Sequence, residues 1–147
     1  MPLAAYARVV DGHVLRVSDG DTLTAVIGGR QTTLRLLYID APERDQRFGP
    51  ESARSLEQLV RLEHLRFDLR GRDKYRRTLA LIVRVSDGAV INLQQVERGM
   101  AWSIARGETE IAYERAQLRA RLAHKGLWED PRPVAPGVWR RSKRANR

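Results

Sequence analysis

The sequence contains no cysteine among its 147 residues. This absence excludes disulfide bonds, thiolate metal sites and a cysteine nucleophile. Histidine is scarce as well, and His13, His64 and His124 lie so far apart in the chain that a zinc site is not expected. No apolar run is long enough to span a bilayer, so the sequence predicts no membrane partner.

Acidic residues are outnumbered by basic ones, with 18 Asp and Glu against 27 Lys and Arg, for a formal net charge of +9. Such an excess favours a polyanionic partner, because each neutralised phosphate releases condensed counterions. The alternative is a solvated basic surface in an arginine-rich proteome, since the chain has only three lysines. The length fits one domain with a real core, and we expect a monomer.

Residues Ala5, Tyr6 and Ala7 have the A-x-A form of a signal-peptidase site, but no hydrophobic segment precedes them. Either a leader has been removed or the pattern is accidental. We therefore expect a secreted or periplasmic protein, with a cytoplasmic one as the alternative.

The stretch from residue 19 to residue 43 reads as a β-hairpin and its exit loop. Strand-like residues run over 22–27 and 31–39, and the Gly28-Gly29 pair between them is typical of a short hairpin turn. Antiparallel pairing about that turn places Asp21 within a residue or two of Arg35.

Two more carboxylates follow the second strand of this hairpin. Pro42 makes straight continuation of the strand unfavourable, so Asp40 and Glu43 can curl back over the open end of the hairpin. Carboxylate oxygens beside a fixed guanidinium suit a hard cation and a phosphate. A plain acidic turn is the alternative.

The remaining pattern predicts an α+β fold, with a five-stranded OB-fold β-barrel as the leading candidate. We expect three α-helices, the second capped by Asn92 and the third carrying Ile111, Leu118 and Leu122 on one face. Residues 1–130 would form the domain, and residues 131–147 would form a basic C-terminal tail that does not fold alone. This tail would lie along the domain through Trp139 or add a weak electrostatic contact. The expected strands are residues 8–18, 22–27, 31–39, 65–70 and 78–85, and the expected helices are residues 50–64, 92–99 and 108–124.

Six motifs, in order and with similar spacing, resemble the micrococcal-nuclease (thermonuclease) family over roughly residues 8 to 130. Each motif alone is weak, but six in register are specific. The resemblance implies an OB-type five-stranded barrel with three helices, in agreement with the pattern. The motifs are DGDT (19–22), LRLLYIDAPE (34–43), FGPESA (48–53), DKYRR (73–77), VINLQQVERGMAW (90–102) and KGLWED (125–130).

The resemblance also implies roles for individual residues. Asp21 and Asp40, with the backbone carbonyl of Ala41, would bind a calcium ion. Arg35 and Arg77 would hold the scissile phosphate, and Glu43 would lie behind the attacking water. The remaining pair, Lys74 and Tyr75, would contact a terminal phosphate of the bound nucleotide.

The chemistry of these residue types agrees with such roles. Calcium prefers oxygen ligands, and this cluster offers only oxygens. Two guanidiniums beside a cation neutralise the charge on the non-bridging oxygens of a phosphodiester. Each residue also has a simpler interpretation as a turn, a cap or a solvated surface group, but these would require six motifs to coincide by accident.

Two departures from the family pattern affect expectations for the site. Arg76 stands where glycine is common, which predicts an altered backbone in that loop. Ile104 stands where a second stacking tyrosine is expected, which predicts weaker stacking of a sugar or base.

The resulting hypothesis is a calcium-dependent endonuclease that hydrolyses single-stranded DNA and RNA and leaves 3′-phosphate ends. The principal alternative is a catalytically silent OB-fold module that binds nucleic acid, because this fold often serves that role. A silent module would lack part of the acidic or arginine set, whereas all five side chains are present. A protein-interaction domain of a larger assembly is disfavoured by the single short domain.

Overall fold

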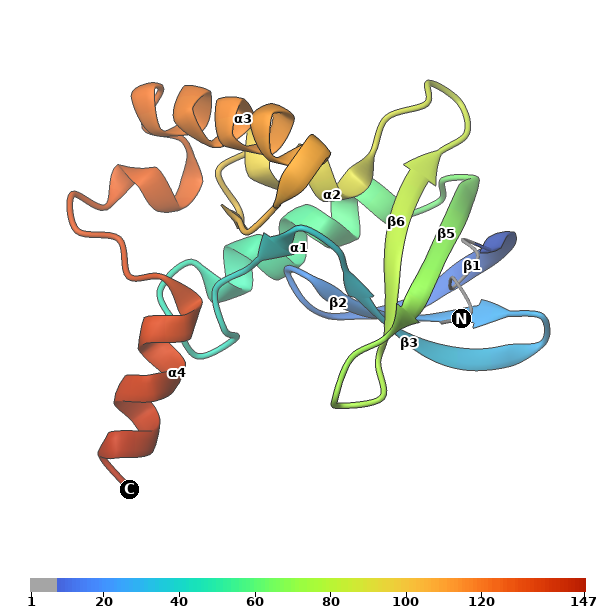
Figure 1. Cartoon of the computed structure of the whole chain (residues 1–147), viewed down its shortest axis with the longest axis horizontal. Coiled ribbons are helices and arrows are strands. Elements are labelled where there is room, and N and C mark those ends of the chain that lie inside the picture. The colour runs from blue at the N-terminus through green and yellow to red at the C-terminus, as the bar shows by residue number, and fades with distance from the viewer. Residues whose placement is uncertain (1–7) are drawn as a thin grey trace.

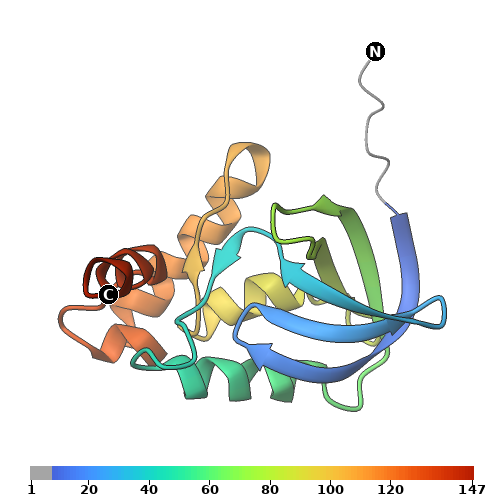
Figure 2. The same cartoon turned by 90° about the horizontal axis from the view of Figure 1, so that it is seen from below.

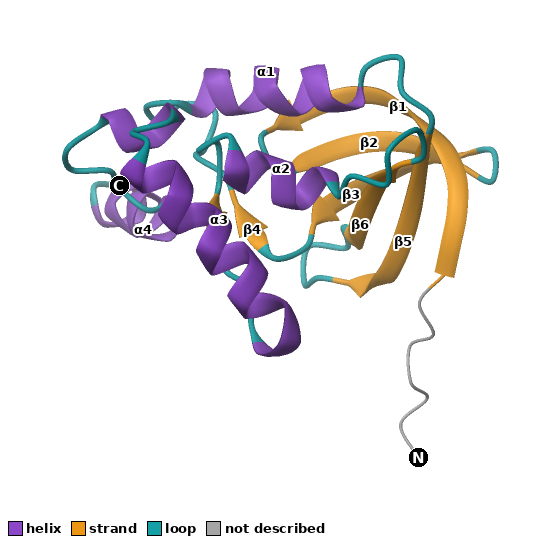
Figure 3. Ribbon diagram, turned by 90° about the horizontal axis from the view of Figure 1, so that it is seen from above, coloured by secondary structure: helices purple, strands orange, loops and turns teal. Residues whose placement is uncertain are grey.

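The computed structural model describes residues 8–147, so the Ala5-Tyr6-Ala7 pattern lies outside the described residues. Five strands close a barrel in the order β1-β2-β3-β6-β5, and two short strands, β4 and β7, pair beside it. Helices gather at one end of the barrel (Figures 1 and 3). This arrangement confirms the predicted α+β OB-type barrel. The strands are β1 (Arg8–Asp19), β2 (Thr22–Ile27), β3 (Arg30–Leu36), β4 (Ile39–Asp40), β5 (Leu65–Arg72), β6 (Thr78–Arg84) and β7 (Trp102–Ser103).

The barrel is antiparallel except where β3 pairs with β6 in parallel. The β2–β3 hairpin has the predicted turn, and both turn glycines have positive φ, 57° at Gly28 and 76° at Gly29. Its register pairs Thr22 with Arg35, so Asp21 lies one residue from the arginine across the ladder, as predicted. Strand β3 ends at Leu36, earlier than predicted, and Tyr38 at φ 71° separates it from β4.

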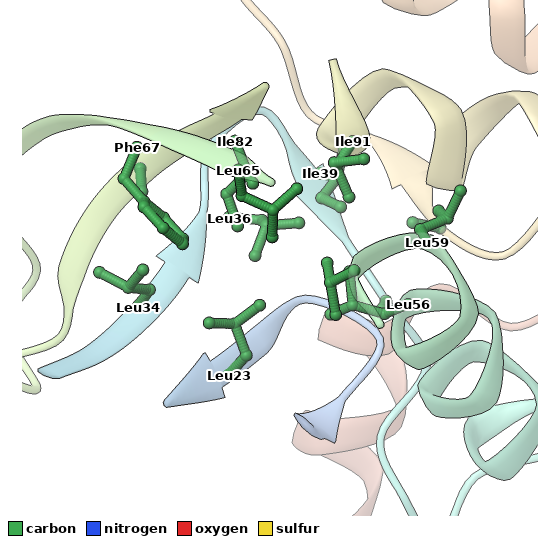
Figure 4. Packing of buried hydrophobic residues seen from close by; sticks show 14 of the residues in the cluster. Leu23, Leu34, Leu36, Ile39, Leu56, Leu59, Leu65, Phe67, Ile82 and Ile91 are labelled. Carbon is green, nitrogen blue, oxygen red and sulfur yellow. The ribbon is translucent and has the colours of Figure 1, made fainter. Parts of the chain in front are cut away.

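The barrel core follows the alternation of apolar residues in the strands. Leu23, Leu34 and Phe67 are fully buried inside it, and Leu56 of α1 and Ile91 of α2 close the helical end of this core (Figure 4). Burial of these side chains supplies most of the stabilising free energy of the domain.

The described residues form four α-helices, one more than predicted. The additional helix, α4, begins with Pro136 at its first turn, a position where proline is favourable, and packs on the domain through its own basic and aromatic side chains. The expected contact through Trp139 is present, whereas the helix itself and its ion pairs were not predicted. The helices are α1 (Gly49–Val60), α2 (Ile91–Glu97), α3 (Glu110–Leu122) and α4 (Pro136–Ala145), with 3-10 turns at Gly107–Thr109 and Gly126–Glu129.

Two expectations about the helices were wrong in detail. Asn92 does not cap α2; it is buried, donates to the carbonyls of Leu37 and Ala80, and accepts from the Ile82 N–H. The predicted apolar face of α3 is solvent-exposed, because the helix packs through Tyr113, Ala116 and Ala120 instead. Small residues allow α3 to approach α2 closely, which the long apolar side chains would prevent.

Between residues 8 and 147, no helix combines the length and apolar character needed to cross a membrane.

Candidate active site

A cavity of about 580 Å³ opens where the barrel, the β5–β6 loop and α4 meet. The β5–β6 loop and α4 project on the same side of the molecule (Figure 1). Seven of the eight predicted site residues line this cavity, and Ala41 does not. The lining residues are Asp19, Asp21, Arg35, Asp40, Glu43, Lys74, Tyr75, Arg77, Gly137, Arg140, Arg141 and Arg144.

Arg35 joins the two predicted metal-binding carboxylates. Its Nη2 lies 3.3 Å from Asp21 Oδ2 and 3.3 Å from Asp40 Oδ1. Its Nη1 donates to the backbone carbonyls of Leu36 and Ile39, at 2.7 and 2.8 Å. The bend between β3 and β4 therefore holds the Arg35 guanidinium in one orientation. The guanidinium in turn holds the Asp21 and Asp40 carboxylates close together.

Asp21 is buried at the floor of the cavity, with 5% of its surface exposed. Burial is the largest cause that raises the pKa of the Asp21 carboxyl to about 7. The positive charge of Arg35 opposes this rise, and the negative charge of the neighbouring Asp19 adds to it. The Ala41 N–H donates to Asp21 Oδ2 at 2.6 Å. Ala41 thus contacts the site through its amide in this structure.

Gly20 and Gln95 fix the backbone next to Asp21. The buried Gln95 Nε2 donates to the Gly20 carbonyl at 2.8 Å. A Cβ on Gly20 would lie 1.7 Å from Ser52 Oγ and 2.7 Å from the Ala41 Cβ. Only glycine permits this close approach, so the packing of α1 against the barrel sets the position of the site.

The β5–β6 loop is shaped by Asp73. Its carboxylate accepts hydrogen bonds from the Tyr75 and Arg77 amides and from Arg77 Nε, the last at 2.7 Å. The Arg77 and Lys74 cations lie over the Tyr75 ring, at 5.3 and 5.1 Å from its centroid. Tyr75 is 65% exposed, so its ring is free to stack on a ligand. Arg76 adopts φ 63°, which gives a physical reason for the glycine common at this position.

Arg140 of α4 reaches into the site, which the sequence analysis did not predict. It donates to Asp40 at 3.0 and 3.3 Å and to Glu43 Oε1 at 2.6 Å. The hydrogen bonds to Asp40 and then to Glu43 raise the pKa of Arg140 above its ordinary value. The sequence feature that could have indicated this contact was the basic C-terminal peptide that begins at Trp139. That feature does not indicate where on the domain the peptide docks.

Asp19 is a second residue that the sequence analysis did not place in the site. Its Oδ1 accepts from the Asp21 N–H at 3.0 Å, as expected of an aspartate in a turn, and it also lines the cavity.

The donor set fits a hard cation. The carboxylate oxygens of Asp21 and Asp40 lie close together in the cavity, where Arg35 contacts both. Asp40 already binds a positively charged group, the Arg140 guanidinium. Residues 8–147 contain no group of three or more acidic or histidine side chains arranged to hold a metal, so additional ligands would come from backbone or water. Calcium accepts such mixed oxygen coordination.

Comparison with known proteins agrees with this geometry. The family model described as Staphylococcal nuclease homologue matches residues 33–130. An uncharacterized endonuclease of Haemophilus influenzae is 40% identical over 135 residues, covering 91% of this chain and 75% of that protein. A micrococcal nuclease of Shigella flexneri is 33% identical over 145 residues, covering 90% of this chain and 82% of that protein.

The chain therefore belongs to the staphylococcal nuclease family. Membership confirms the predicted class of enzyme, a nuclease that hydrolyses ester bonds of nucleic acids.

Proposed function

We propose that the protein is a calcium-dependent endonuclease that cleaves single-stranded DNA and RNA and leaves 3′-phosphate ends. The observation that supports this proposal is the shared cavity, which combines two carboxylates, two arginines and Glu43. Tyr75, which is exposed and contacts the Lys74 and Arg77 cations, provides a stacking surface for an unpaired base.

Asp21 and Asp40 would hold the calcium ion, and the carbonyl of Ala41 would be the third protein ligand. When bound, calcium supplies charge neutralisation at a non-bridging oxygen of the scissile phosphate. The rest of the chemistry belongs to the side chains of this chain.

Arg35 and Arg77 bind the scissile phosphate from two sides. Arg35 is preorganised, because its Nη1 is fixed on backbone carbonyls. Arg77 uses its Nε for Asp73, and within residues 8–147 its Nη groups have no hydrogen-bond partner. Both guanidiniums thus bind more strongly as negative charge grows on the phosphorane oxygens, which lowers the barrier.

Glu43 orients the attacking water and accepts its proton. The water oxygen forms the new bond to phosphorus in line with the 5′-oxygen, and the phosphorus–oxygen bond to that leaving group breaks. The 5′-oxygen takes up a proton and departs as a hydroxyl, so the phosphate stays on the 3′ side. The Glu43 Oε1 accepts from Arg140, whereas its Oε2 has no hydrogen-bond partner among residues 8–147, so Oε2 is the oxygen available to the water.

The test is incubation of the protein with heat-denatured DNA in calcium, in magnesium and in chelator, followed by analysis of the product ends. We expect cleavage in calcium, and we expect chelator to abolish it. The 3′ ends of the products should become extendable only after a phosphatase removes their terminal phosphate. Binding of denatured DNA in calcium without cleavage would instead support the silent binding module.

Three features of the wider protein stay predictions: export to the periplasm or medium, a monomeric state, and a domain boundary near residue 130. Cell fractionation, sedimentation and limited proteolysis test them in turn.

A further inference from the structure

Helix α4 lies outside the segment that the family model matches, residues 33–130. It nevertheless contributes Gly137, Arg140, Arg141 and Arg144 to the cavity that contains the site. Figure 2 shows α4 in dark red at the helical end of the molecule, away from the β2–β3 hairpin. What this helix does is therefore a property of this chain beyond the matched domain.

Several contacts dock α4 on the loop that follows β4. Arg140 pairs with Asp40 and Glu43, and Lys143 pairs with Asp45. Trp139 lines a small pocket together with Phe48 and Trp102 of the domain. Since these contacts fix the rotation of the helix, they also fix which side of it faces the cavity.

Arg141 and Arg144 share that side but not those contacts. Residues three apart on a helix lie on the same face. Across the described chain, residues 8–147, neither side chain forms an ion pair with a carboxylate. Two guanidiniums without an ion pair thus line the cavity from α4, while Lys74 and Arg77 line it from the β5–β6 loop, together with the carboxylates of the site. Figure 1 shows α4 and the β5–β6 loop as two separate projections.

Basic walls on both sides of an acidic floor fit an extended polyanion better than a single nucleotide. In a bound polynucleotide, one phosphate would lie over the floor, where Arg35 and a cation compensate its charge. Phosphates of neighbouring nucleotides would lie against the walls, which offer guanidinium and ammonium groups.

We propose that α4 is a wall of the substrate groove, in which Arg141 and Arg144 bind backbone phosphates of nucleotides flanking the scissile one. This inference rests on the proposed nuclease site and extends it to a polynucleotide subsite. The two arginines contribute to binding of long single strands and contribute nothing to a substrate with a single diester.

The first experiment measures binding without cleavage. A fluorescent 20-nucleotide single strand is titrated in chelator against wild-type protein, the double variant Arg141→Gln/Arg144→Gln, and the control Arg115→Gln/Arg119→Gln. The control removes the same charge from two exposed arginines of α3 that do not line the cavity. Circular dichroism melts check that all three proteins fold.

We expect the α4 variant to bind about tenfold more weakly, and the slope of its affinity against salt to fall by about 1.4, since each of the two lost phosphate contacts on a single strand accounts for about 0.7. The control should change binding by less than twofold. Equal weakening in both variants, or no change in the α4 variant, would overturn the proposal.

The second experiment separates this inference from the nuclease proposal. With calcium, the α4 variant should show a raised KM on the 20-mer and unchanged kinetics on a p-nitrophenyl diester of one nucleoside. An equal rise of KM on both substrates would contradict a flanking subsite. If the wild type cleaves neither substrate, the nuclease proposal fails, whereas a selective binding loss in the first experiment would still support α4 as a wall of the groove.

Discussion

Arg140 donates a hydrogen bond of 2.6 Å to Oε1 of Glu43, a residue 97 positions earlier in the chain. The same guanidinium holds both carboxylate oxygens of Asp40. A side chain from the C-terminal helix therefore occupies one proposed metal ligand and the proposed water-orienting group at once. A cation that binds Asp40 would compete with this guanidinium.

Removal of Arg140 should strengthen calcium binding. In the wild type the ion competes with a guanidinium for Asp40, and a partly exposed pair of this kind contributes about 1 kcal/mol. Arg140→Gln should therefore bind calcium about fivefold more tightly by isothermal titration calorimetry. Lys143→Gln, which removes a pair of the same helix with Asp45, is the control and should have little effect. Weaker calcium binding in Arg140→Gln would contradict this competition.

Asp21 should make the metal-free protein less stable as pH rises from about 4 to about 7. Its pKa is about 7 in the folded state and ordinarily 3.8, so the folded protein binds one proton more than the unfolded chain in that window. The free energy of unfolding then falls with increasing pH and levels off above 7. Urea unfolding in chelator should show this fall in the wild type relative to Asp21→Asn. Parallel pH profiles for the two proteins would refute the assignment.

Substitution of Gly20 should disturb the fold and the site together. A Cβ at this position would overlap Ser52 Oγ of α1, at 1.7 Å, and press on Ala41. We expect Gly20→Ala to lower the free energy of unfolding by about 1–3 kcal/mol and to reduce cleavage. Gly137→Ala is the matched control, because a Cβ there meets no atom closer than 3.6 Å and alanine favours a helix. A fully active, equally stable Gly20→Ala protein would show that this packing is dispensable.

Arg76 carries backbone strain that glycine would relieve. Its φ of 63° is unfavourable for a residue with a Cβ, by about 1 kcal/mol. Arg76→Gly should raise the free energy of unfolding by about that amount, as measured by urea denaturation. Arg72→Gly, four residues earlier in β5, should lower it, since φ there is not in the left-handed region. Equal losses in both variants would argue against strain at Arg76.

The sequence predicted the hairpin and its register, because alternation and a two-glycine turn are local signals. It also predicted most of the cavity lining, since six motifs in register specify a whole site. The role of the Ala41 carbonyl stays a prediction, whereas the hydrogen bond from its amide to Asp21 was not predicted. That hydrogen bond depends on the bend from β3 to β4, for which the sequence has no clear signal.

The C-terminal helix shows where prediction from sequence stopped. Trp139, Arg140 and Lys143 are ordinary residues of a basic peptide until the loop after β4 supplies their pocket and their carboxylates. The prediction of which face of α3 is buried was wrong for a related reason. Two of its three buried residues, Ala116 and Ala120, are small and count for less in a hydrophobic pattern than the exposed Leu118 and Leu122. Both outcomes depend on tertiary packing.

The rate of single-strand cleavage by Glu43→Gln is the most direct test of the proposed site. Glu43 is partly exposed and its carboxylate pairs only with Arg140 among the described residues, so the substitution should leave the fold intact. Asp45→Asn is the matched control, because it also removes a carboxylate that pairs with α4. We predict that Glu43→Gln loses at least a hundredfold in kcat with calcium, while Asp45→Asn keeps the wild-type rate. Wild-type cleavage by Glu43→Gln, or equal losses in both variants, would contradict the account.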